Sequence, residues 1–227
     1  GEGCGIDEET QLTEPTTTEI TGVLLAGGLS RRMGGGDKGL LDLAGASMLA
    51  RVIDRVRGQV GDLVINANGD PDRFKQFALP VTADTLPDNP GPLAGVLAGM
   101  RWAGRNRAAA RYVLTVSTDA PFVPRDLADR LAAALAKGTG AIALARSAGK
   151  LHPVIALWPV DLADDLEMAV RDDGIRKVLA WTDRHGVTAV DFAPIRIGEQ
   201  SIDPFFNANT PEEMDEARRL IRAGGTL

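Results

Sequence analysis

The sequence predicts an α/β fold: a single domain of three layers, in which a mostly parallel sheet carries helices on both faces. Short apolar runs alternate with segments whose apolar residues recur every three or four positions, the pattern of strands and helices in turn. Strands that are joined through helices lie parallel to one another. Neither a repeat nor a linker divides the 227 residues, and 44% of them are hydrophobic, enough for one core.

The first two thirds of the chain show this alternation most clearly. An apolar strand is expected over residues 20–25, followed by a glycine-rich loop and a short extended piece over 40–43. Ser47 should cap a helix that ends near Gly58, because its hydroxyl can accept a bond from the first turn. A Pro-rich turn at 87–92 precedes another helix. The other predicted elements are strand 62–66, short helix 71–77, strand 81–83, strand 111–116, helix 124–137 and strand 140–145.

The last third of the chain is less regular. Residues 150–158 form a predicted strand that His152 and Pro153 interrupt, which places it at an edge or at a bulge of the sheet. Thr210 and Glu213 have the capping-box spacing and enclose a proline, so the final helix should begin here. The remaining predicted elements are helices 162–170 and 175–185 and a strand over 187–192.

Acidic residues are concentrated at the N-terminus. Residues 1–19 contain six Asp or Glu and no Lys or Arg, so we predict a disordered acidic tail before a domain at 20–227. The domain carries equal numbers of acidic and basic residues, which argues against a nucleic-acid or anionic-membrane binder. No apolar run is long enough to span a membrane, and the tail lacks the features of a secretory signal. With Cys4 as the only cysteine, we expect a cytoplasmic protein.

A glycine-rich loop follows the first strand, within TGVLLAGGLSRRMGGGDKGLL at residues 21–41. Glycines there let backbone N–H groups approach an anion closely. Arg31, Arg32 and Lys38 stand in this stretch, and no Asp or Glu occurs between residues 20 and 36. Backbone donors with uncompensated Arg and Lys side chains suit a polyphosphate, so the loop is predicted to bind a nucleotide phosphate.

Two better-known phosphate loops do not fit this stretch. A Walker loop has Gly before its Lys and Ser or Thr after it, whereas Asp37 precedes Lys38 and Gly39 follows it. A GxGxxG does occur at Gly34, Gly36 and Gly39, but it begins well after the strand has ended. The alternative is an ordinary glycine-rich surface loop. The three basic residues, with no Asp or Glu over residues 20–36, argue against it.

Polar groups stand where the predicted strands end, and open parallel sheets bind their ligands at that edge. None of these groups is His or Cys, which argues against a nucleophilic triad and a hydrolytic zinc site. Attack by a substrate phosphate on the α-phosphorus of a nucleoside triphosphate needs no strong base, only charge neutralisation and in-line positioning. The residues at this edge are Leu25, Ala26, Gly27, Gly28, Asn66, Asp84, Ser117, Thr118 and Asp119.

Asp119 is the predicted Mg²⁺ ligand. It follows the clearest strand of the chain, and Ala120 and Pro121 give a rigid exit that would hold its carboxylate outward. An isolated Asp at a strand end more often caps a helix or forms a turn. Here two carboxylates converge with a phosphate loop, which favours a site.

The stretch LLAGGLSRRMGGGDKGLL at residues 24–41 resembles the signature of the molybdenum cofactor guanylyltransferases. Its GG-x-DKGLL portion is similar to this branch of the nucleotidyltransferase superfamily in particular, and the similarity continues to residues 207–211. The resemblance implies a Rossmann-like nucleotidyltransferase fold with Mg²⁺ as cofactor. It also implies transfer of GMP from GTP to the terminal phosphate of molybdopterin, with release of pyrophosphate.

The resemblance implies roles for individual residues as well. Asp119 would bind Mg²⁺ and Lys38 the phosphates, and both would be catalytic together with Arg32. The family's pattern before the carboxylate is Cys-x-x-Asp or Pro-x-Asp, from which Ser117 and Thr118 depart, so the contacts that flank Asp119 stay open. The implied GTP contacts are Leu25, Ala26, Gly27, Gly28, Lys38, Asn66, Asp84 and Asp119.

Three further residues are implied as contacts to molybdopterin or to a second metal: His152, Asn207 and Asn209. From the residues alone, the two asparagines could equally form a turn before the last helix, and a lone His near a Pro is more often structural. The expected partners are GTP, molybdopterin or Mo-molybdopterin, and proteins that deliver the pterin or accept it as molybdoenzymes.

Alternative functions stay open within and beyond this fold. Base choice depends on a few loop contacts, so a molybdenum cofactor cytidylyltransferase or a sugar-phosphate nucleotidyltransferase is the nearest alternative. A non-catalytic nucleotide-binding subunit would be expected to lose the metal carboxylate or the lysine, yet Asp119 and Lys38 are both present. A nicotinamide-dependent reductase needs an early glycine fingerprint that is not in register here.

Overall fold

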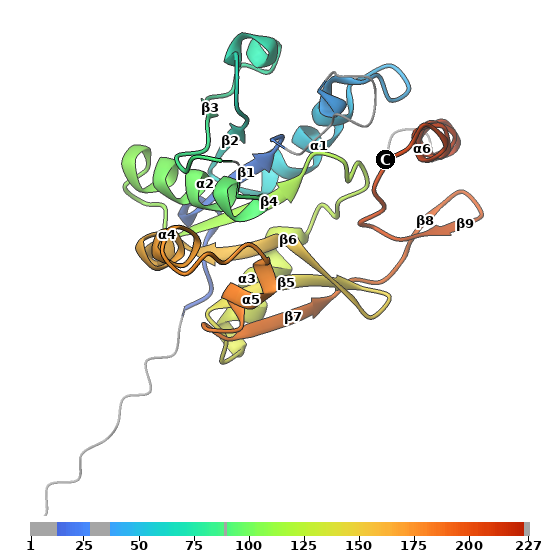
Figure 1. Ribbon diagram of the computed structural model, residues 1–227. Helices are drawn as coiled ribbons and strands as arrows, with labels where there is room; N and C mark the ends of the chain where they lie inside the picture. The colour runs from blue at the N-terminus through green and yellow to red at the C-terminus, as the bar shows by residue number, and fades with distance from the viewer. Residues whose placement is uncertain (1–12, 28–36, 89, 225–227) are drawn as a thin grey trace, which may run out of the picture.

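A twisted sheet of seven strands forms the centre of the computed structural model, which describes residues 13–27, 37–88 and 90–224 (Figure 1). The strand order is β3-β2-β1-β4-β6-β5-β7. β6 runs antiparallel to β4 and β5, and the other neighbours are parallel. The predicted α/β fold is confirmed. The strands are β1 (Ile20–Leu25), β2 (Asp62–Asn66), β3 (Val81–Thr82), β4 (Tyr112–Ser117), β5 (Ile142–Ser147), β6 (Lys150–Pro159) and β7 (Val187–Asp191).

Helices cover both faces of the sheet, because alternate residues of each strand point to opposite sides. In β4, for example, Leu114 joins one core cluster and Val113 joins the other. The first cluster packs under α1 (Met48–Val56) and α3 (Leu127–Lys137). The second packs under α2 (Pro92–Asn106), α4 (Ala163–Arg171) and α5 (Val178–Thr182).

A third core cluster lies beside the sheet, where α6 (Pro211–Gly224) packs with β8 (Ile195–Ile197) and β9 (Gln200–Ile202). Figure 1 shows this C-terminal unit next to the segment that leads into α1. Sequence analysis did not predict the β8–β9 hairpin. Short 3₁₀ helices complete the fold: η1 (Thr17–Glu19), η3 (Lys38–Leu40), η4 (Arg57–Gln59), η5 (Pro71–Phe77) and η6 (Val160–Leu162).

Two predicted helix starts are confirmed by their caps. The Ser47 hydroxyl accepts a bond from Ala50 N at 3.1 Å at the start of α1. At α6, Thr210 Oγ1 accepts from Glu213 N at 3.2 Å, while Glu213 Oε2 accepts from Thr210 N at 2.9 Å and Asn209 N at 2.7 Å. The reciprocal cap therefore fixes the residues that lead into α6 as well as the helix itself.

The predicted edge position of the strand at 150–158 is wrong, although its alternative, a bulge, is found. β6 lies inside the sheet between β4 and β5. Its register with β5 jumps, so that Leu144 pairs with Ala156 but Ala145 pairs with His152. Pro153 has no N–H to donate to a neighbouring strand, and the extra residues of the bulge accommodate it.

The domain begins before the predicted boundary at residue 20. Pro15 is buried, and Glu19 Oε2 accepts a bond from Thr16 N at 2.9 Å. The Glu19 carbonyl also accepts from Arg111 N at 2.9 Å, next to β4. The end of the predicted tail is therefore part of the folded chain.

Over the described ranges, no helix has the length and apolar character needed to cross a membrane.

Helix α5 is shorter than the helix predicted at 175–185, and a carboxylate of α4 holds its end in place. Asp165 Oδ2 accepts from Trp181 Nε1 at 2.8 Å and bonds His185 Nε2 at 2.7 Å. The Trp181 ring is fully buried against Trp158, with ring centroids 5.9 Å apart. The bond from Trp181 is the main reason why the pKa of Asp165 lies below its ordinary value.

Asp165→Asn should therefore lower stability at neutral pH and reduce the loss of stability in acid. A carboxyl whose pKa is depressed by folding stabilises the protein above its unfolded pKa, and this contribution is lost as pH falls through the folded pKa. The difference between the two proteins should thus be constant above about pH 5 and shrink below about pH 4. Urea unfolding across this range measures it, with the exposed neighbour Asp183→Asn as control. A difference that grows in acid would contradict the assignment.

Candidate active site

Several of the predicted site residues meet at the carboxyl edge of three adjacent strands, β2, β1 and β4. Leu25, the last residue of β1, pairs in register with Asn66 at the end of β2 and with Ser117 at the end of β4. Just beyond, Ala26 N donates to the Asn66 carbonyl at 2.9 Å, and Thr118 Oγ1 donates to the Leu25 carbonyl at 3.4 Å. Two predicted residues, Gly28 and Arg32, lie outside the described residues, whereas Gly27 is included.

Asp84 is held at one end of this edge by two amide side chains. Asn66 Nδ2 donates to its Oδ1 and Asn68 Nδ2 to its Oδ2, both at 2.9 Å. Asn68 Oδ1 accepts from the Asp84 backbone N at 2.8 Å, so Asn68 and Asp84 form reciprocal hydrogen bonds. Each carboxylate oxygen keeps a further lone pair, and the group can still accept bonds from a ligand.

Gly95 of α2 allows the helix to approach this pair, a role that sequence analysis missed. A Cβ at position 95 would lie 2.4 Å from Asn66 Oδ1 and 2.8 Å from the Leu25 side chain. Asn66 itself is only 3% exposed, so it has no room to move aside. A glycine in the first turns of an apolar helix was the available signal.

A second group of residues surrounds Asp119, beyond the end of β4. The Ser117 hydroxyl donates to Asp119 Oδ1. Ser117, which departs from the family pattern, is therefore one of the contacts that flank Asp119. Lys38 Nζ lies 3.4 Å from Asp119 Oδ2 and also donates to Asn209 Oδ1. The Asn207 amide nitrogen can face Asp119 Oδ1 and the Phe205 carbonyl, each at 3.2 Å. Lysine, carboxylate and asparagines therefore come together from three distant parts of the chain.

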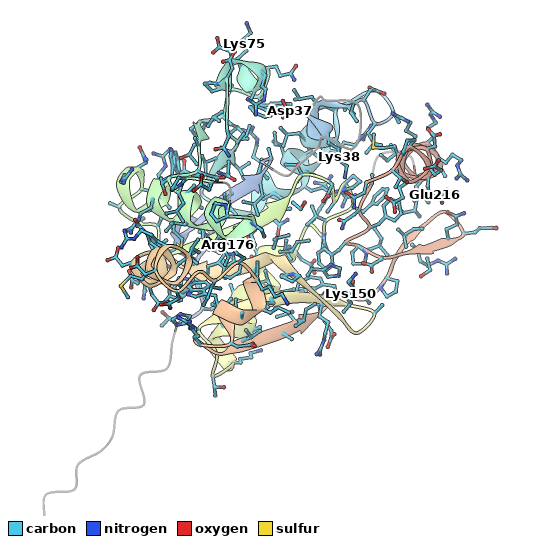
Figure 2. The ribbon with its side chains drawn as sticks, in the orientation of Figure 1. Asp37, Lys38, Lys75, Lys150, Arg176 and Glu216 are labelled. Atoms are coloured by element: carbon cyan, nitrogen blue, oxygen red, sulfur yellow. The ribbon has the colours of Figure 1, made fainter. Side chains whose placement is uncertain are left out.

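Arg73 links Asp37 to the Asp84 end of the site. Its guanidinium forms an ion pair with Asp37, the neighbour of Lys38, although the contact is not a well-aligned hydrogen bond. The same group donates to the carbonyls of Asn68 and Asp70, both at 2.6 Å. Figure 2 shows Asp37 and Lys38 near one another at the end of β1. Arg73 was not among the predicted site residues, because it lies far along the chain from its partner Asp37.

Comparisons with known proteins identify the family of this chain. Residues 22–187 match the family model described as a MobA-like NTP transferase domain. The chain belongs to the MobA-like NTP transferase family. A molybdenum cofactor guanylyltransferase of Bradyrhizobium sp. (strain ORS 278) is 49% identical to it over 92% of this chain and 96% of the relative. One from Rhodopseudomonas palustris (strain BisB5) is 52% identical over 87% of this chain and 92% of the relative.

Solved structures show that the fold of this MobA-like chain is shared more widely. The molybdopterin-guanine dinucleotide biosynthesis protein A from Archaeoglobus fulgidus has a TM-score of 0.67 at 20% identity, covering 89% of this chain and 98% of that protein. The 4-diphosphocytidyl-2C-methyl-D-erythritol synthase from Anaerococcus prevotii DSM 20548 has a TM-score of 0.65 at 11% identity, covering 91% and 97%. These likenesses show the fold, and the family match makes the chain a nucleotidyltransferase.

The oxygen donors of this MobA-like site suit a hard divalent cation such as Mg²⁺. Within the described part of the chain, no three His, Cys, Asp or Glu residues cluster in a way that could hold a metal ion. Mg²⁺ commonly takes one or two carboxylates, with substrate phosphates and waters for the rest. Asp119 supplies a carboxylate, and half a turn of the Asn207 amide would present its oxygen instead of its nitrogen. Asp119 and Asn207 would therefore hold the ion.

His152 forms a cluster with Ser147 and Asp203. Its Nε2 is 2.6 Å from Ser147 Oγ, which in turn lies 2.8 Å from both carboxylate oxygens of Asp203. A nucleophilic triad needs the imidazole between the hydroxyl and the carboxylate, whereas here a serine that is 3% exposed occupies the middle. Burial lowers the pKa of His152, so the neutral imidazole is favoured.

Proposed function

We propose that this MobA-like enzyme transfers GMP from GTP to the terminal phosphate of molybdopterin, or of Mo-molybdopterin, and releases pyrophosphate. The observation that carries the proposal is the meeting of Lys38, Asp119 and Asn207 at the carboxyl edge of β1 and β4. The names of relatives that are 49% and 52% identical support the substrates. Proteins that deliver the pterin and accept the product are proposed partners.

The chemistry requires charge neutralisation more than proton transfer. An oxygen of the molybdopterin phosphate attacks the α-phosphorus of GTP, and the bond from that phosphorus to pyrophosphate breaks, so the nucleophile is already anionic. Lys38 would neutralise phosphate oxygens, while Ser117 and the backbone around Ala208 keep the Asp119 carboxylate in place. Mg²⁺, when bound by Asp119 and Asn207, supplies further positive charge to the phosphates.

Asp84 is the proposed guanine contact. Guanine differs from the other bases in presenting a ring N–H beside an exocyclic amine, and one carboxylate can accept from both. The amides of Asn66 and Asn68 already orient the Asp84 carboxylate, so little freedom would be lost on binding.

GTP with Mg²⁺ should raise the melting temperature clearly more than CTP, ATP or UTP at equal concentration. Binding to the native state alone stabilises it in proportion to the logarithm of ligand concentration over Kd, so the ranking reports base preference. Thermal unfolding with each nucleotide, with and without EDTA, provides the measurement, and no pterin is needed. Equal shifts would remove guanine specificity from the proposal, and a preference for CTP would favour the cytidylyltransferase alternative.

A further inference from the structure

The segment from Asp203 to Asn209, between β9 and α6, carries both asparagines of the site but has no regular secondary structure. Nothing in a helix or strand ladder therefore fixes the positions of Asn207 and Asn209. Their geometry depends on the bonds made at the two ends of the segment.

The end near the site is tied to Asp119 and to the last helix. Ala208 N donates to the Asp119 carbonyl at 3.0 Å, and Asn209 N donates to Glu213 Oε2 at 2.7 Å. Both bonds lie at the C-terminal end of the segment, at Ala208 and Asn209. The other end needs its own anchor.

That anchor is a chain of hydrogen bonds from the β5–β6 hairpin. The Asp203 carboxylate accepts from Phe205 N at 2.8 Å and from the Ser147 hydroxyl at 2.8 Å. Ser147 has a single proton, so the hydroxyl that donates to Asp203 accepts from His152 Nε2, 2.6 Å away. His152 thus donates to Ser147, Ser147 donates to Asp203, and Asp203 fixes the turn at Phe205.

Packing reinforces the same anchor. The Phe205 ring is 2% exposed and lies 4.7 Å from the His152 ring and 5.2 Å from the Phe192 ring, between centroids. Ser147 is also buried, so water cannot easily replace a lost partner of Asp203 or His152. The hydrogen bonds and the aromatic contacts hold one short stretch of chain in one place.

We propose that Asp203, Ser147 and His152 are positioning residues, which hold the 203–209 segment so that Asn207 reaches Asp119 and Asn209 reaches Lys38. The inference rests on the proposed function for its catalytic consequence, but the anchoring itself does not. It gives His152 a role as a donor to Ser147 in place of a direct contact to the pterin.

Hydrogen exchange of Asp203→Ala tests the anchoring without any substrate. The amides of Ala208 and Asn209 should exchange about tenfold faster or more, the change expected when one or two net hydrogen bonds are lost. Asp165→Ala is the matched control. Asp165, like Asp203, is a carboxylate with two bonded partners, and these are Trp181 and His185 on the α4–α5 side of the sheet. It should speed exchange around residues 178–185 and leave 204–210 unchanged. Unchanged exchange at 204–210 in Asp203→Ala would overturn the proposal.

Milder variants separate positioning from loss of folding. Asp203→Asn keeps one oxygen that can accept from Ser147 and Phe205, so it should restore most of the protection at 204–210. Ser147→Ala should behave like Asp203→Ala, because it breaks the chain in the middle. If Asp203→Asn failed to restore protection, or if Ser147→Ala exchanged normally, the hydrogen bonds would not be what fixes the position of the 203–209 segment.

The catalytic consequence is tested through Mg²⁺. Asp203→Ala should weaken GTP affinity about tenfold more with Mg²⁺ than in EDTA, where only the smaller loss through Asn209 and Lys38 remains. The additional Mg²⁺-dependent loss should disappear in an Asn207→Ala background. Equal losses with and without Mg²⁺ would overturn positioning through Asn207. If the unmutated protein showed no Mg²⁺-dependent GTP binding, the proposed function would fail while the exchange result stood on its own.

Discussion

Replacing Asp119 by Ala should abolish turnover, by roughly a thousandfold or more, and yet leave GTP binding in EDTA as tight as before or slightly tighter. A carboxylate beside a triphosphate is repulsive unless a cation lies between them. The side chain is 23% exposed and contacts Ser117, Lys38 and Asn207, so its removal leaves no large cavity. The expected loss is therefore in metal-dependent chemistry and not in folding.

Calorimetric titration of GTP into Asp119→Ala, with Mg²⁺ and with EDTA, measures the effect. The control is Asp126→Ala, an exposed acid before α3 whose side chain makes no capping bond. It should match the unmutated protein under both conditions. Normal turnover in Asp119→Ala, or an equal loss of GTP binding in EDTA, would show that Asp119 does not act through a metal.

The sequence allowed the residues at the carboxyl edge of the sheet to be predicted because local patterns mark where each strand ends. Each predicted strand is an apolar run that is followed by polar residues, and parallel strands bring those ends together at one edge of the sheet. Leu25, Asn66 and Ser117 therefore lie at one edge of the sheet, as expected. Asp119 and Lys38 lie 3.4 Å apart for the same reason, since each follows one of two adjacent strands, β4 and β1.

Contacts between distant side chains could not be predicted in the same way. Ser147 and Asp203 bond across 56 residues, and nothing in either local sequence marks the pair. The position of β6 inside the sheet depends on antiparallel pairing with β4, whereas His152 and Pro153 locally favour an edge. Glu19 belongs to the domain because it bonds Arg111, although its neighbours in sequence have the composition of a tail.

Replacing Lys38 by Ala should weaken GTP binding both with Mg²⁺ and in EDTA, by about 1.5–3 kcal/mol. The lysine ammonium meets phosphate oxygens directly, so its contribution does not need a metal. Lys38 is 15% exposed and is already oriented by Asn209 and Asp119, which reduces the entropy lost on binding. This behaviour would distinguish it from Asp119, whose effect should vanish without the metal.

The measurement is again calorimetry under both conditions, with Lys75→Ala as the control for loss of one positive charge. Lys75 is an exposed lysine on η5, well away from Lys38 (Figure 2). It should bind GTP like the unmutated protein, because solvent screens a distant exposed charge. Asn209→Ala should fall between the two, since it frees the ammonium without removing it. If Lys38→Ala lost affinity only with Mg²⁺ present, the lysine would act by holding the Asp119 region in place, and direct contact with the phosphates would be excluded.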